Sequence, residues 1–376
     1  MSTQPEAKVI SGLEGVLACG SSVCFIDGPG GTLLYRGYAI GDFVEEAEFL
    51  DVVWLLWHGD WPDAAQSQAF AAEVAARRAL PATVAGFIAG APIATANPMS
   101  ILRTAVSMLG VEDPNADDIS AESVVSKATG LLSRLPTVVA AMSRLVRGDD
   151  PVAPDTGLGH AANFLYMLTG EPPSGSAAAA LNAVLNTYAE HELNASTFTA
   201  RTTVGTLSDY YSAITSASGA LKGALHGGAV DDAMGAFREI GEPENVVAFV
   251  EAALAARRKV PGFGHRVYRT RDPRCAAMDR LAGELGEAAG EPDWHAVATG
   301  LERELLERKG LSANVDYYSA LVLYHLGFPL NMFTSFIAAS RIAGWTAHLL
   351  EQYADNRLIR PRALYEGETA RPYPPG

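Results

Sequence analysis

The sequence predicts an all-α protein with one small β-hairpin near its N-terminus. Apolar residues recur at i, i+3 and i+4 through most of the chain, which is the period of a half-buried helix. The composition is 48% hydrophobic and 8% aromatic, as expected for a globular rather than a disordered chain. The strand signature is confined to residues 24–37, CFIDGPGGTLLYRG, where short apolar runs flank a turn rich in glycine and proline.

The helices that we expect after the hairpin share this apolar period. They cover residues 45–59, 64–80, 99–110, 121–148, 175–222, 244–258, 273–287, 293–309, 315–326 and 330–353. Pro136 should kink or split its helix, because proline lacks an N–H group and clashes with the preceding turn. Residues 199–214 are expected to form one helix. The polar break at 114–122 is too short to separate domains.

The charge balance excludes one class of partner. Lysine and arginine number 28 and aspartate and glutamate 43, so the formal net charge is −15. An acidic surface repels phosphate backbones, and we therefore expect no nucleic-acid partner.

The cysteines and the chain's apolar runs indicate a cytoplasmic protein. The cysteines are Cys19, Cys24 and Cys275, a sparse odd set that suits a reducing compartment and lacks zinc-site spacing. The first twelve residues carry no targeting pattern. The apolar run 327–350 is interrupted by Arg341 and His348, which favours a buried helix over a membrane span.

Three of the eight histidines have neighbours that suggest a site. Glycines bracket His226 in GALHGGA and His265 in VPGFGHRVY, and glycine lets the backbone turn sharply and a ligand approach closely. His191 lies in AEHELNAST, among polar residues at the end of a helical run. The others are expected to be hydrogen-bonded structural histidines: His58, His160, His295, His325 and His348.

A basic cluster and one aspartate complete the candidates. Residues 257–274 hold seven lysines and arginines, a quarter of the chain's 28. This clustering predicts a ligand with several negative charges, either phosphates or carboxylates, although helix-end and surface charges are the alternative. Asp316 comes just before an apolar helix, where it is either an N-cap or a general base with a raised pKa.

Taken together, these residues resemble the citrate synthase family, in its shorter bacterial and archaeal form. The matching blocks stand in the family's order: HELNAST at 191–197, GALHGGA at 223–229, VPGFGHRVYRTRDPR at 260–274, NVDYYSA at 314–320, and SRIAGWTAHLLEQ through NRLIRPRALY at 340–365. The opening GLEGVLACGSSVCFIDGPGGTLLYRGY is also similar, so the resemblance covers nearly the whole chain.

The resemblance implies an acyltransferase that condenses acetyl-CoA with oxaloacetate and then hydrolyses citryl-CoA. Asp316 would remove the methyl proton, His226 would hydrogen-bond the thioester oxygen, and His265 would polarise the oxaloacetate carbonyl. The residues implied for oxaloacetate are His191, Arg274, Arg341 and Arg360, the last reaching across a homodimer. Those implied for coenzyme A are Lys259, Val260, Pro261, Gly262, Phe263, Gly264, Arg269 and Arg271. The family implies no metal and no cofactor besides the CoA thioester.

The resemblance also implies two domains and leaves alternatives open. Residues 1–224 and 328–376 would form a large helical domain, and residues 225–327 a small domain that closes over the substrates. A 2-methylcitrate synthase would use propionyl-CoA with the same acid–base groups. A citryl-CoA lyase and a non-catalytic CoA- or carboxylate-binding relative are more distant. The block around His226 departs from the family, with Ala224 where proline is usual and Val230-Asp231 where asparagine–glutamate is usual.

Overall fold

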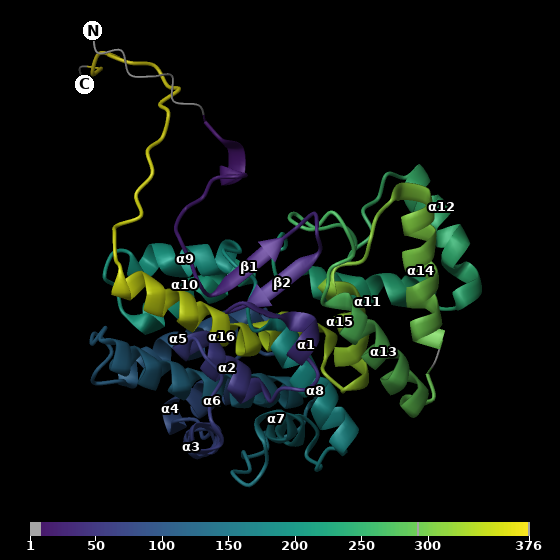
Figure 1. The fold of residues 1–376 in the computed structure, drawn as a ribbon, viewed down its shortest axis with the longest axis horizontal. Coiled ribbons are helices and arrows are strands. Elements are labelled where there is room, and N and C mark those ends of the chain that lie inside the picture. Colours follow the sequence, from purple (N-terminus) through teal and green to yellow (C-terminus); the bar gives the residue numbers. More distant parts are fainter. Residues whose placement is uncertain (1–8, 292, 375–376) are drawn as a thin grey trace.

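The computed structural model describes residues 9–291 and 293–374 and is almost wholly helical (Figure 1). One small antiparallel sheet lies near the N-terminus, with strands β1 (Cys24–Asp27), β2 (Thr32–Tyr35) and β3 (Tyr38–Ala39) in that order. Cys24 pairs with Tyr35 and Asp27 with Thr32, which closes the glycine-rich turn. The all-α class and the hairpin are therefore confirmed.

The described residues form sixteen α-helices and three short 3-10 helices. The α-helices are α1 (Ile40–Phe43), α2 (Phe49–His58), α3 (Ala64–Ala76), α4 (Ala82–Gly90), α5 (Pro98–Glu112), α6 (Ala121–Arg147), α7 (His160–Thr169), α8 (Gly175–Tyr188), α9 (Ala195–Val204), α10 (Tyr210–Leu221), α11 (Ala229–Ile240), α12 (Val246–Ala255), α13 (Cys275–Ala289), α14 (Asp293–Lys309), α15 (Val315–His325) and α16 (Phe333–Ala354). The 3-10 helices are η1 (Ser11–Leu13), η2 (Pro243–Asn245) and η3 (Leu330–Met332).

The core is organised around α6 and α16. These two helices pack on each other, and α16 also packs on α2, α8, α9 and α10. Trp345, Phe336 and Ile342 of α16 are fully buried, so this helix is covered on all sides by the others. No helix among the described residues has both the length and the apolarity that a membrane span requires.

Of the two outcomes expected at Pro136, a kink or a split of the helix, the split is wrong. Helix α6 runs without a break from Ala121 to Arg147, and Pro136 lies inside it. Its neighbours Leu135 and Val138 are fully buried. Packing around this stretch outweighs the one helical hydrogen bond that proline cannot make.

The expectation of one helix over residues 199–214 is also wrong. Helix α9 ends at Val204, and α10 begins at Tyr210. Between them Leu207 has a φ of 64°, a left-handed conformation that no helix accommodates. The side chain of Asp209 then caps α10 by accepting a hydrogen bond from the Ser212 N–H.

The hairpin turn between β1 and β2 packs on the loop that follows His265. The Arg269 N–H donates to the Gly28 carbonyl at 3.1 Å. A Cβ on Gly28 would lie 2.2 Å from the Val267 carbonyl oxygen, so this approach requires glycine. The N-terminal sheet therefore supports a segment 240 residues further along the chain.

Helices α11 to α15 gather at one end of the molecule, on the right in Figure 1. There α13 packs on α15 and α12 on α14. The loop that carries His265 leads into α13, and the segment that carries Asp316 begins α15. The candidate residues therefore lie where this group meets α8 and α16, both of which it contacts.

Candidate active site

Asp316 lies in the first turn of α15 but does not cap it. The cap is Asn314, whose side chain accepts a hydrogen bond from the Asp316 N–H at 3.0 Å. Asn314 also binds the glycine loop, because its N–H donates to the Gly262 carbonyl and its Nδ2 to the Gly264 carbonyl, both at 2.9 Å. The Asp316 carboxylate is thus free of capping and close to the loop of His265.

The Asp316 carboxylate accepts a hydrogen bond from the Tyr188 hydroxyl, at 2.9 Å from Oδ1. Burial raises the pKa of Asp316, while Tyr188, Arg274 and Arg341 oppose that rise. A carboxylate with a raised pKa is a stronger base than an exposed one. The neighbouring donor and cations still favour its ionised form.

His265 is held in one tautomer by its own loop. Its Nδ1 accepts hydrogen bonds from the N–H groups of Val267, at 3.0 Å, and Tyr268, at 3.1 Å. Backbone N–H groups only donate, so the ring proton lies on Nε2. Burial and Arg274 lower the pKa of His265 to about 4, and the ring is neutral near pH 7.

His226 is held in the opposite tautomer. Its Nε2 accepts from the Ser196 N–H at 3.3 Å, and the Ser196 hydroxyl lies 2.8 Å from the same nitrogen. The ring proton therefore lies on Nδ1. Trp345 Nε1 donates to the Ser196 hydroxyl oxygen at 3.1 Å, which fixes Ser196 in turn. Burial and Arg341 lower the pKa of His226 to about 4.

His191 lies beside His265, with ring centroids 5.3 Å apart. Its Nε2 is buried and has no hydrogen-bond partner among the described residues. Burial, Arg274 and His265 lower its pKa well below the usual value, and His226 is close enough to contribute. A buried ring nitrogen without a partner is costly unless a ligand supplies one.

The two buried arginines of the site are held differently. Arg274 donates from Nε and Nη2 to the Asp272 carboxylate at 2.9 and 2.7 Å, and Asp272 also accepts from the Val315 N–H at 3.2 Å. Although burial opposes it, Arg274 keeps the pKa of Asp272 low. Arg341 donates from Nε to the Tyr188 carbonyl at 2.6 Å.

These contacts bring three neutral imidazoles, one carboxylate and two arginines into one region. Arg274 and Arg341 influence both His191 and Asp316, which links the two sides of the site. Such a set binds an anion with several charges, places a base beside it, and presents neutral N–H donors to developing negative charge.

The structure does not bring Arg360 to this region. It lies exposed in the segment after α16, which runs away from the helical body (Figure 1). Arg360 makes no hydrogen bond or ion pair with a described residue of its own chain.

The residues expected to bind coenzyme A lie around the glycine loop, apart from Arg271. Gly262 and Gly264 have φ angles of 82° and 76°, and a Cβ on Gly262 would lie 2.8 Å from the Tyr317 ring. Lys259 and Arg269 are exposed on either side of this loop. Arg271 instead forms ion pairs with Glu302 and Asp279.

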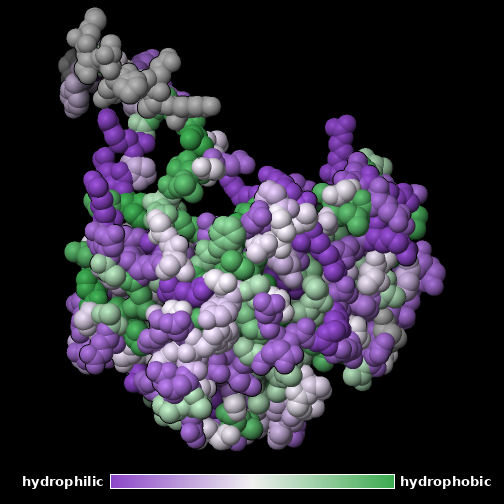
Figure 2. Space-filling model, in the orientation of Figure 1, coloured by the Kyte–Doolittle hydropathy of each residue, from purple (hydrophilic) through white to green (hydrophobic). Residues whose placement is uncertain are grey.

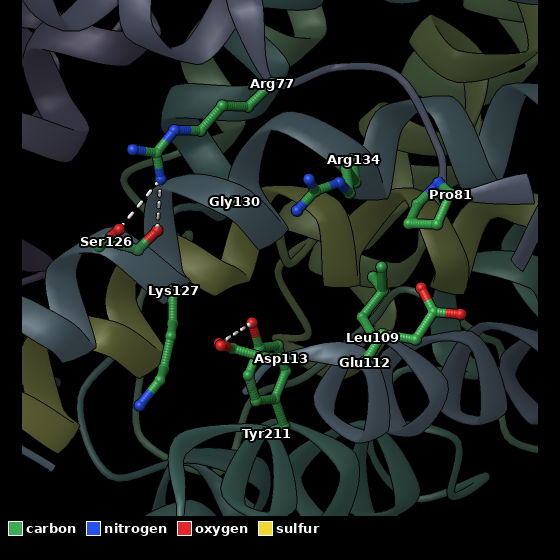
Figure 3. Close-up of a pocket in the computed structure, with 10 residues that line it drawn as sticks. All are labelled: Arg77, Pro81, Leu109, Glu112, Asp113, Ser126, Lys127, Gly130, Arg134 and Tyr211. Atoms are coloured by element: carbon green, nitrogen blue, oxygen red, sulfur yellow. Dashed lines mark hydrogen bonds between the residues drawn. The ribbon is translucent and has the colours of Figure 1, made fainter. Parts of the chain in front are cut away.

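A cavity of about 350 Å³ lies elsewhere, between α6, the ends of α3 and α5, and the start of α10 (Figure 3). Arg77, Lys127 and Arg134 line it together with two carboxylates. None of the candidate residues contributes to it. A second cavity of about 230 Å³, lined by Ala224 and Gly228, adjoins the His226 loop.

Comparison with known proteins decides the family. Residues 12–362 match the family described as citrate synthase, C-terminal domain. This chain belongs to the citrate synthase family. It is 45% identical over 361 residues to citrate synthase from Haloferax volcanii, which covers 95% of each chain. It is 39% identical to 2-methylcitrate synthase from Mycobacterium tuberculosis, which covers 99% of this chain and 93% of that one.

A citrate synthase structure matches the fold. The ternary complex of carboxymethyl coenzyme A and oxaloacetate with citrate synthase from Thermoplasma acidophilum has a TM-score of 0.93 and 31% identity over 98% of each chain. The citrate synthase fold thus accounts for the whole described helical body and its small sheet.

Sequence reasoning missed the residues that hold the candidate groups. Tyr188 contacts Asp316 from 128 residues away, and Ser196 contacts His226 from 30 residues away. Trp345 in turn holds Ser196 from 149 residues away. One signal was available, because Ser196 belongs to the same HELNAST block as His191. Nothing in the sequence alone pairs Tyr188 with Asp316.

Proposed function

We propose that this chain is a citrate synthase that joins the methyl carbon of acetyl-CoA to the keto carbon of oxaloacetate and hydrolyses the resulting citryl-CoA. One observation carries the proposal. A carboxylate with a raised pKa, Asp316, shares a site with two imidazoles whose free N–H groups are fixed by hydrogen bonds.

Asp316 is the base in this proposal. The methyl group of a thioester is a weak acid, and a carboxylate removes its proton only if the forming enolate oxygen is stabilised at the same time. His226 supplies that stabilisation through Nδ1–H, which is free because Ser196 occupies Nε2. The pKa of His226 is low, so its ring is neutral near pH 7. It therefore donates this hydrogen bond without carrying a second ring proton.

His265 acts on the second substrate. Its Nε2–H is directed by the two backbone donors on Nδ1 and polarises the keto oxygen of oxaloacetate. The same proton then neutralises the alkoxide that forms at that carbon. His191, Arg274 and Arg341 bind the remaining oxygens, and the unpartnered His191 Nε2 supports this role.

Coenzyme A binds along the glycine loop in this proposal, with Lys259 and Arg269 near its phosphates. Both cations are exposed beside Val260, Pro261, Phe263 and the loop glycines. Arg271 contributes only through its ion pairs, which hold the loop to α13 and α14. No other cofactor is required.

Domain closure and a shared dimer site complete the proposal. Residues 225–327 form the small domain and close on the large one, which excludes water before the carbon–carbon bond forms. Arg360 reaches the oxaloacetate site of the partner subunit. Exposed apolar side chains gather on the two terminal segments, including Leu17 at 94%, Leu358 at 58% and Leu364 at 61%, and support a second copy as their partner (Figure 2).

Thiol release tests the proposal directly. Purified enzyme mixed with oxaloacetate and acetyl-CoA is expected to release free CoA at a steady rate, and omission of either substrate is expected to stop it. Binding of both substrates without CoA release would identify a non-catalytic relative instead.

A second candidate is 2-methylcitrate synthase, which the Mycobacterium tuberculosis relative favours through its match to 99% of this chain. One methylene in an apolar pocket changes transition-state binding by about 1–3 kcal/mol. The ratio of kcat/KM for acetyl-CoA and propionyl-CoA therefore decides between the two. A ratio above one supports citrate synthase, and one below it supports the alternative.

The cellular setting is part of the same proposal. We place the enzyme in the cytoplasm and in the tricarboxylic acid cycle. All three cysteines are unpaired thiols, as a reducing compartment favours.

A further inference from the structure

We propose that His348 holds the Glu190 carboxylate as a counter-ion of Arg341 while keeping it out of contact with the Arg341 guanidinium. This inference rests on the proposed function, in which Arg341 binds oxaloacetate. Glu190 and His348 are then positioning residues that set how tightly the enzyme holds a dianionic substrate.

The Glu190 carboxylate is completely buried, and the described residues show no ion pair between it and Arg341. Its Oε1 accepts a hydrogen bond from His348 Nε2 at 3.0 Å. Its Oε2 has no hydrogen-bond partner among the described residues. A Cβ on Gly344 would lie 1.9 Å from Oε2, so the carboxylate rests directly on α16, one turn from Arg341.

The orientation of His348 is fixed by a group that only donates. Arg201 Nη1 lies 3.0 Å from His348 Nδ1, so Nδ1 accepts and the ring proton lies on Nε2, facing Glu190. Arg201 is itself held by Glu351 Oε2 and Gln352 Oε1, each at 3.1 Å. The ring of His348 is fully buried between these two partners.

Arg341 needs a counter-ion but makes no direct ion pair. It is 5% exposed, and the only hydrogen bond from its side chain to a described residue is the one from Nε to Tyr188. Glu190 is the carboxylate that most strongly opposes the effect of burial on the charge of Arg341. A buried cation without such a partner would be strongly destabilising.

Arg274 shows the effect of a carboxylate that contacts the guanidinium directly, as Glu190 does not contact Arg341. Asp272 occupies two of the Arg274 donors, Nε and Nη2. The anchored Glu190 leaves both Nη groups of Arg341 without a partner in the part of the chain that the structure describes. Arg341 therefore keeps a two-donor fork for a substrate carboxylate, although its charge is balanced before the substrate arrives.

The arrangement has a cost for binding. Glu190 stabilises the empty site, but its negative charge opposes a dianion that binds to Arg341. It opposes a more highly charged product still more. Glu190 thus lowers affinity in a way that favours turnover.

Glu190→Gln tests the inference, since it keeps the size of the side chain and an acceptor for His348. Oxaloacetate Kd, measured by calorimetric titration, is expected to fall about tenfold, because the opposing charge of about 1.4 kcal/mol is gone. The Tm of the empty variant is expected to fall, and saturating oxaloacetate is expected to restore it. An unchanged or higher Kd, or a variant that oxaloacetate does not rescue, overturns the inference.

His348→Phe should shift affinity the other way. The phenyl ring cannot hold Glu190, which then pairs with Arg341 directly and competes with substrate, so Kd is expected to rise at least about tenfold. The control is Glu351→Gln, which alters the same network at its partly exposed end and should leave Kd within about twofold. A fall in Kd for His348→Phe contradicts the inference, and if that variant does not fold, Glu190→Gln decides alone.

The wild-type enzyme separates this inference from the proposed function. If wild-type protein neither binds oxaloacetate nor releases CoA, the proposed function fails. If it does both and Glu190→Gln shows no tighter binding, only the role of Glu190 and His348 fails.

Discussion

The hydroxyl of Tyr188 donates a hydrogen bond to Oδ1 of Asp316 at 2.9 Å, across 128 residues of chain. Tyr188 ends α8 in the middle of the core, and Asp316 lies in the first turn of α15, in the group of helices beside it. The contact therefore orients the proposed base from the opposite side of the site, across the boundary between α8 and α15. It also makes the ionised form of Asp316 more favourable than burial alone would allow.

Tyr188→Phe is expected to lower kcat at least about tenfold, the lower range for one group that assists proton transfer. Loss of the donor raises the pKa of Asp316 further, so the acid limb of the kcat profile should move to higher pH. A pH series of initial rates measures both effects. The matched control is Tyr210→Phe, which loses a buried hydrogen bond to Thr346 and should leave the limb in place.

Asp316→Asn should bind oxaloacetate nearly normally and lose turnover by at least about 100-fold. The amide keeps the shape of the side chain but cannot take the methyl proton. Oxaloacetate titration and thiol release measure the two quantities separately. Near-normal turnover would show that another group is the base.

Acid should destabilise the free enzyme between pH 6.5 and 4. The pKa values of His226 and His265 are lowered to about 4, below the value of about 6.5 in an unfolded chain. In that window the unfolded state binds more protons, so the free energy of unfolding falls as the pH is lowered. Denaturant unfolding at several pH values checks this, and the variant His226→Gln/His265→Gln should show a flatter dependence.

Gly344→Ala is expected to destabilise the protein by more than about 2 kcal/mol and to abolish oxaloacetate binding. Its Cβ would lie 1.9 Å from Glu190 Oε2 and 2.5 Å from the Ala189 carbonyl, a clash that the packed core cannot relieve. Thermal unfolding measures the loss. Gly235→Ala is the control, because its Cβ meets nothing within 4 Å on an exposed turn of α11 and should stabilise the helix by about 0.5–1 kcal/mol.

Mixed dimers test the proposed role of Arg360. An Arg360→Ala subunit and an Asp316→Asn subunit are each expected to be inactive alone. In a mixed dimer one of the two sites combines the intact Asp316 with the intact Arg360, so activity should return to about half the wild-type value. Verified mixed dimers without activity would show that Arg360 is not shared across the interface.

The sequence was sufficient to predict the elements whose signal is local. The hairpin turn, the periodic helices and the glycine-bracketed histidines all depend on neighbouring residues, and the structure contains each of them. The break at Leu207 was not predicted, and the predicted split at Pro136 does not occur. In the first case turn residues interrupt an apolar period, and in the second tertiary packing overrides a helix breaker.

In the candidate site, too, the sequence predicted only what depends on neighbouring residues. Asp316 was ambiguous between cap and base, since either role suits an aspartate before an apolar run. Asn314 resolves this by taking the cap, which only the geometry reveals. His348 was interpreted as a structural histidine because its contacts, Glu190 and Arg201, are about 150 residues away in sequence.

The position of α16 near the end of the sequence affects folding of the chain during its synthesis. It is the last of the described helices to leave the ribosome. Its residues donate hydrogen bonds to the carbonyl groups of Leu185, Tyr188 and Ala189 at the end of α8. Until it docks, the nascent protein exposes the apolar surfaces of α6 and α8 and leaves Glu190 without its imidazole. Premature termination before Phe333 should therefore yield chains that aggregate or need chaperones, rather than a weakened enzyme.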